Sequence, residues 1–125
     1  MTPLFAILAA ALAQGGAPAS VSDDDAAVIF MQSRLVPATF ALCAEFYPAT
    51  AADYTAALSA WNRTNKASIE RGGAHARKRL QQEGQDLDEM LTVERGKLQD
   101  EIRQMPEADR TGLCERMLVT TRAGS

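Results

Sequence analysis

The stretch from Leu42 to Asn65, LCAEFYPATAADYTAALSAWNRTN, decides how the chain folds. It contains one of the two cysteines, both tyrosines and the single tryptophan of the sequence. Pro48 is expected to end one helix, because proline lacks the backbone donor that a helix interior needs. The segment from Thr50 to Asp53 has the spacing of a capping box, with Asp in place of the preferred Glu. The stretch therefore predicts the end of one helix, a tight corner and the start of a second helix.

The N-terminal residues 1–13, MTPLFAILAAALA, have the pattern of a secretory signal peptide. Their apolar run is too short to span a bilayer, which takes about 20 residues. Cleavage after Ala13 follows the small-x-small rule, and Ala19 offers a second cleavage site. The alternative is an N-terminal core helix, but the Gly, Pro and Ser residues of 14–20 do not continue a helix. We expect a signal peptide at 1–13 (or 1–19), a mobile linker at 14–21, a helical domain at 22–122 and a frayed tail at 123–125.

The composition of the chain predicts an all-α fold. The 125 residues make a single domain, 46% of them are hydrophobic, and good helix formers dominate. The net charge of −3 argues against nucleic acid as a partner. No segment after the signal is expected to be long enough to span a membrane. We expect a small bundle of about four helices after a cleavable signal peptide.

The first helix of the domain is expected to run from Asp23 to Tyr47, with Ser22 as its N-cap. Pro37 lies inside this helix and is expected to kink it. Its apolar residues cover so much of its circumference that it must be central in the bundle or covered by a partner. A homodimer through this helix is therefore one possible assembly.

Glycines at 72 and 73 form the clearest interruption of the remaining sequence. They are expected to act either as a hinge between two helices or as a strained interruption of one. A long polar helix with a narrow apolar seam is expected over residues 74–105. A last helix is expected from Glu107 to Thr121, with Pro106 at its first turn.

The two cysteines, Cys43 and Cys114, are far apart in the sequence and have no histidine cluster near them. This pattern fits neither a redox pair nor a zinc site. In an oxidising compartment they are expected to pair, which would clamp the first helix to the last. Closing so long a loop contributes about 4 kcal/mol in the chain-entropy model. If the signal interpretation failed, two buried free thiols would be the favoured alternative.

The sequence contains no constellation of residues that predicts catalysis, a metal site or a cofactor site, so an enzyme is not expected. The single histidine lies in a basic run that could form an anion patch. The favoured interpretation is a solvated basic turn that is balanced by acidic residues at 83, 86, 88 and 89. The members of this candidate patch are Arg71, His75, Arg77, Lys78 and Arg79.

A second group, at the end of the opening stretch, consists of Trp61, Asn62, Arg63 and Asn65. Trp and Arg are common anchors of protein interfaces, so the group is a candidate interaction site. For Trp61 itself a core position is favoured, because apolar residues share its helix face. Asn65 is expected on that same face, where a buried amide needs hydrogen-bond partners.

These observations predict an exported protein, periplasmic or secreted, that is not an enzyme and acts through protein–protein interaction. An accessory, inhibitor or immunity-type protein fits this description. The alternative is a carrier or sensor of a small apolar ligand, which would bind beside the kink of the first helix. Its pocket would be lined by Pro37, Phe40, Phe46, Tyr47 and Trp61.

Overall fold

The computed structural model describes residues 21–125, and every regular element within this range is a helix. The elements are α2 (Asp23–Phe46), the 3₁₀ turn η2 (Pro48–Thr50), α3 (Ala51–Thr64), α4 (Lys66–Gln82), α5 (Leu87–Gln104) and α6 (Glu107–Ala123). The predicted all-α class is confirmed, whereas the predicted number of about four helices is too low by one. The predicted signal peptide and residues 14–20 of the linker lie outside the described residues.

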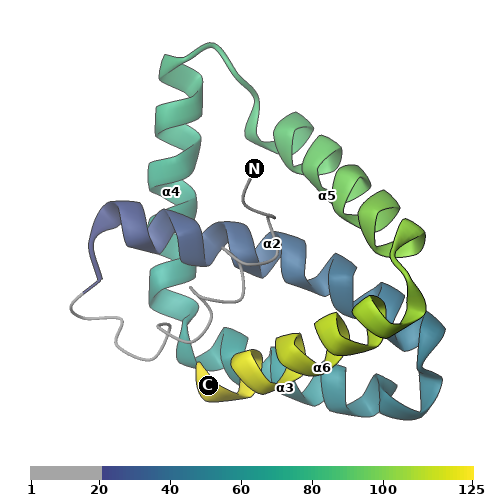
Figure 1. Ribbon diagram of the computed structural model, residues 1–125. Coiled ribbons are helices and arrows are strands. Elements are labelled where there is room, and N and C mark those ends of the chain that lie inside the picture. Colours follow the sequence, from purple (N-terminus) through teal and green to yellow (C-terminus); the bar gives the residue numbers. More distant parts are fainter. Residues whose placement is uncertain (1–20) are drawn as a thin grey trace.

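Helix α2 lies at the centre of the fold and contacts α3, α4, α5 and α6 (Figure 1). It begins as predicted, because the Ser22 side chain accepts a hydrogen bond of 3.1 Å from the backbone N–H of Asp25. Leu35, Val36 and Phe40 are buried among the surrounding helices. The apolar circumference that prompted the homodimer hypothesis is thus covered largely within one chain, and the dimer stays a prediction.

By length and composition, α2 is also apolar enough to cross a membrane. The expectation that no segment after the signal reaches spanning length was therefore wrong for this helix. In the fold, 61% of its most apolar window is buried against its neighbours. That burial is typical of a central core helix, which has the same length and composition as a spanning one.

The glycines at 72 and 73 do not interrupt a helix, since α4 passes through both of them. Helix α4 crosses α2 at this point, and a Cβ added to Gly72 would lie 1.8 Å from the backbone oxygen of Ala26. A Cβ added to Gly73 would lie 2.9 Å from the Phe30 ring. These glycines therefore allow two helices to approach closely, which accounts for both without a hinge.

The single long helix predicted over residues 74–105 was also wrong, because the chain turns at Gly84. Gly84 has a φ of +71°, and the N–H of Gln85 donates to the carbonyl of Leu80. This is a Schellman ending, in which glycine tolerates the left-handed backbone. Helix α5 then starts with Asp86 as its N-cap, which accepts a 3.0 Å hydrogen bond from the N–H of Glu89.

The chain turns after α2 at the predicted place, but the hydrogen bonds that form the turn differ from those expected. Thr50 makes no capping hydrogen bond through its side chain, so the expected capping box is absent. Instead, Pro48–Thr50 forms one 3₁₀ turn, and the N–H of Thr50 donates to the carbonyl of Tyr47 at 3.0 Å. The turn leads directly into α3.

The predicted disulfide is confirmed: the sulfurs of Cys43 and Cys114 are 2.04 Å apart and their Cα atoms 5.8 Å apart. The bond joins α2 to α6, the first and last described helices. Helix α6 packs more extensively on α3 than on α2; the two helices α3 and α6 lie next to each other at the bottom of Figure 1. The disulfide therefore ties α6 to the central helix α2, although α6 packs mainly on α3.

Candidate interaction site

A cleft of about 370 Å³ opens between α2 and the junction of α3 with α4. We call it the basic cleft. Five of its seven lining residues are exposed, so it is open to solvent and is not an enclosed cavity. Its lining residues are Ser33, Arg34, Asn62, Arg63, Lys66, Ile69 and Glu70.

The three cations of the basic cleft have no ion-pair partner among the described residues. Arg63 and Lys66 stand on neighbouring turns of the α3–α4 junction, and neither forms an ion pair with Glu70. Arg34 comes from α2, and its guanidinium carbon lies 5.1 Å from the centroid of the Phe30 ring. This cation–π contact orients the side chain without cancelling its charge. The cleft thus has net positive charge on a protein of net negative charge.

On the same α3–α4 segment, Trp61 and Asn65 are fully buried. The Asn65 side chain donates hydrogen bonds to the carbonyls of Trp61, at 2.9 Å, and Gly124, at 3.1 Å. These two bonds give the amide N–H groups of the buried Asn65 the partners that were expected. The predicted interaction group is therefore divided: Asn62 and Arg63 line the cleft, whereas Trp61 and Asn65 belong to the core.

Three buried polar atoms near this junction have no hydrogen-bond partner in the described part of the chain: Trp61 Nε1, Asn65 Oδ1 and Ser68 Oγ. All three residues fall at helical spacing along one face of the α3–α4 segment. Such groups in folded proteins are commonly satisfied by internal water.

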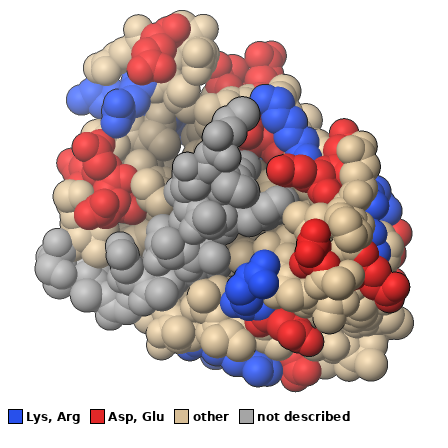
Figure 2. All heavy atoms as spheres, viewed as in Figure 1, with Lys and Arg blue, Asp and Glu red and all other residues tan. Residues whose placement is uncertain are grey.

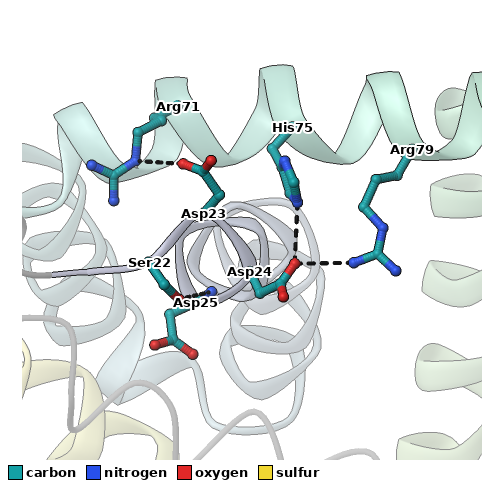
Figure 3. Close-up of polar contacts among 7 residues, drawn as sticks. All are labelled: Ser22, Asp23, Asp24, Asp25, Arg71, His75 and Arg79. Atoms are coloured by element: carbon teal, nitrogen blue, oxygen red, sulfur yellow. Dashed lines mark hydrogen bonds and ion pairs between the residues drawn. The ribbon is translucent and has the colours of Figure 1, made fainter.

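The predicted basic patch on α4 is largely neutralised by the first turn of α2 (Figure 3). Arg71 lies 3.5 Å from a carboxylate oxygen of Asp23. His75 and Arg79 converge on Asp24, at 3.1 Å and 3.0 Å respectively. The patch thus fixes the start of α2 on α4, although each exposed pair contributes little free energy.

The acidic residues at 83, 86, 88 and 89, which were predicted to balance the basic patch, make fewer ion pairs with it than Asp23 and Asp24 do. Only Arg77 approaches one of them, at 4.0 Å from Asp88, and Lys78 is exposed. Acidic and basic side chains are interspersed over the face of the molecule in Figure 2, which displays no large area of one sign.

Two of the residues predicted to line an apolar pocket, Phe40 and Phe46, contact side chains from outside that group. Phe40 stacks on Tyr54, with ring centroids 4.9 Å apart. The guanidinium of Arg110 lies 3.9 Å from the centroid of the half-buried Phe46 ring. The remaining members of that predicted pocket are Pro37 and Tyr47, both half-buried, and the buried Trp61.

Within residues 21–125, no group of three or more His, Cys, Asp or Glu side chains is arranged to hold a metal ion.

Burial raises the pKa of Tyr54, and a hydrogen bond with the Thr50 side chain works against this effect. Glu94 of α5 is half-buried, and its carboxylate lies 3.4 Å from the Lys97 ammonium.

Comparison of this chain with models of protein families, with curated proteins and with solved structures finds no match. The site is therefore interpreted from its geometry. Sequence reasoning singled out Asn62 and Arg63 but missed Arg34 and Lys66. The spacing of Arg63 and Lys66, two cations on one side of a helix, was a signal for the second of these. No local signal could place Arg34 beside them, because it comes from another helix.

Proposed function

We propose that this protein is exported, to the periplasm or outside the cell, and acts without catalysis by binding another protein at the basic cleft. The observation that carries the proposal is that Arg34, Arg63 and Lys66, which have no ion-pair partner among the described residues, line one open concavity. Several cations elsewhere on the surface, Arg79 and Arg103 among them, are paired with acids of the same chain, whereas single exposed cations such as Lys78 are not. Unpaired cations grouped in a concave surface favour a partner of complementary charge.

The form of the cleft favours a protein partner over an enclosed small ligand. Sites for small molecules usually bury most of the surface of the ligand. Here the cations stand on an exposed rim, and the volume of about 370 Å³ suits a few side chains of a partner. Arginine is also enriched at the energetic centres of protein interfaces.

Export is supported by the apolar N-terminal sequence together with the disulfide. Disulfides persist in oxidising compartments and are rare in the cytosol. The bond between Cys43 and Cys114 is compatible with that environment.

Site-specific photo-crosslinking in the cells that naturally produce the protein tests the proposal. A photoreactive amino acid replaces Asn62, in the cleft, or Asp100, an exposed residue of α5 that serves as the control. The proposal predicts a discrete covalent adduct with one other protein from position 62, which mass spectrometry then identifies. Adducts that form equally at both positions, or at neither position, contradict it.

A further inference from the structure

We infer that the basic cleft recognises an acidic peptide segment of its partner that also carries an aliphatic side chain, an inference that rests on the proposed function. Three cations and one carboxylate line the cleft, whereas the chain as a whole has a net charge of −3. The local sign is therefore opposite to the global one. Such a site attracts an anionic group to this position while the rest of the surface repels it.

The cations are placed to act together on carboxylates. Arg63 and Lys66 line the cleft from the α3–α4 junction and Arg34 lines it from α2, so cations of two separate segments border the same concavity. The position of Arg34 is constrained twice, by the Phe30 ring under its guanidinium and by the Arg95 side chain, which donates to its backbone oxygen at 3.3 Å. Because the planar guanidinium donates two parallel hydrogen bonds to a carboxylate, the two arginines favour this ligand over a simple point charge.

The remaining lining residues define what accompanies the carboxylates. Ile69 is half-buried and offers an apolar surface to the cleft. The buried Ser33 hydroxyl donates to the carbonyl of Phe30, so its proton is not available to a ligand. Asn62 has an exposed amide that can bond the backbone of an extended peptide. Together these groups suit a segment in which glutamate or aspartate flanks an aliphatic residue.

Glu70 is the one lining residue whose charge would repel this ligand. Its carboxylate is exposed and makes no ion pair with the cations beside it, so it adds negative charge where the peptide's carboxylates would dock. Removing that charge is expected to strengthen binding. A cleft whose cations served only solubility or folding would not show this gain.

Nucleic acid is a poorer match than an acidic peptide. Its binding needs a row of cations along several phosphates, and here the cations are confined to one short cleft. Acidic side chains are interspersed with basic ones on the face that Figure 2 displays.

Fluorescence anisotropy with a labelled peptide of alternating glutamate and leucine tests the inference on the full folded domain. Binding is expected to the wild-type protein and to weaken at least about tenfold in the Arg63→Ala/Lys66→Ala double variant, which loses two charge-assisted contacts. The Glu70→Gln variant is expected to bind several-fold more tightly. Raising NaCl from about 0.1 M to about 1 M shortens the Debye length from ~10 Å to ~3 Å and is expected to weaken binding.

The matched control is the Lys78→Ala/Arg116→Ala double variant, which removes two exposed cations outside the cleft and changes the net charge equally. It is expected to bind the peptide like the wild type. Equal binding of a peptide with glutamine in place of glutamate, equal losses in the two double variants, or tighter binding of single-stranded DNA than of the peptide would each overturn the inference. A cross-link from position 62 without peptide binding leaves the proposed function intact and refutes the acidic segment. Peptide binding without a cross-link supports the acid-binding cleft and refutes the proposed partner.

Discussion

Gly72 of α4 lies against the backbone of Ala26 in α2, so closely that a Cβ at position 72 would come within 1.8 Å of the Ala26 carbonyl oxygen. The neighbour is backbone and cannot rotate away. Gly72→Ala is therefore expected to force the two helices apart and to lower the free energy of unfolding by about 3 kcal/mol or more. Chemical denaturation measures this change.

Gly96 provides the control for that substitution. It also lies inside a helix, α5, but a Cβ there would meet nothing within 4 Å. Gly96→Ala is expected to leave stability unchanged or to raise it by up to about 1 kcal/mol, because alanine favours the helix. Similar effects of the two substitutions would show that the close helix crossing is not what requires Gly72.

The Asn65 amide connects the α3–α4 junction to the end of α6. Asn65→Ala removes its hydrogen bonds to the carbonyls of Trp61 and Gly124 in a buried setting. A loss of about 1–3 kcal/mol in the free energy of unfolding is expected. The exposed neighbour Asn62 is the control, and Asn62→Ala is expected to change stability by no more than about 0.5 kcal/mol. Equal effects at the two positions would be inconsistent with this role.

The stability of the fold is expected to fall at alkaline pH because of Tyr54. Burial raises the pKa of its phenol above the ordinary value of 10.0. The folded state therefore holds the proton more tightly than the unfolded state. This contribution is fully present below pH 10, the ordinary value, and is lost as the pH rises through the folded-state pKa.

Tyr54→Phe keeps the stacking ring but removes the titrating hydroxyl. Thermal denaturation of both proteins between about pH 7 and pH 11 should show a steeper alkaline decline for the wild type. Parallel curves for the two proteins would mean that the phenol does not contribute to the pH dependence.

The parts of the fold that follow from local chemistry were predictable from the sequence. The cap at Ser22, the end of α2 near Pro48 and the pairing of Cys43 with Cys114 all agree with the structure. The turn at Gly84 was missed, although the spacing of Asp86 and Glu89 already resembled a helix start.

The features that depend on contacts between distant helices could not be predicted. The same two glycines read as a chain break in the sequence and as a close helix crossing in the fold, because Ala26 is far away in the chain. The candidate site shows the same limit. Its local pair, Asn62 and Arg63, was found, but Arg34 joins it only through the packing of α2.

The disulfide is expected to resist reduction until the protein unfolds, since Cys43 and Cys114 are 0% and 1% exposed. In the native state, thiol labelling after a short treatment with reductant should remain low, and it should become complete in denaturant. Replacing both cysteines by alanine is expected to cost about 4 kcal/mol, according to the chain-entropy model for so long a loop. Rapid reduction without unfolding, or an unchanged melting temperature in the double variant, would contradict a stabilising clamp.

The proposal that the protein acts in an exported form includes two features of the chain, the removed signal peptide and the closed disulfide. Intact-mass spectrometry of the protein purified from the cells that naturally make it tests both at once. The expected mass is that of a chain beginning at Gln14 or Ser20, reduced by the two hydrogens lost when Cys43 and Cys114 pair. The mass of all 125 residues with both thiols intact would contradict export and the clamp together.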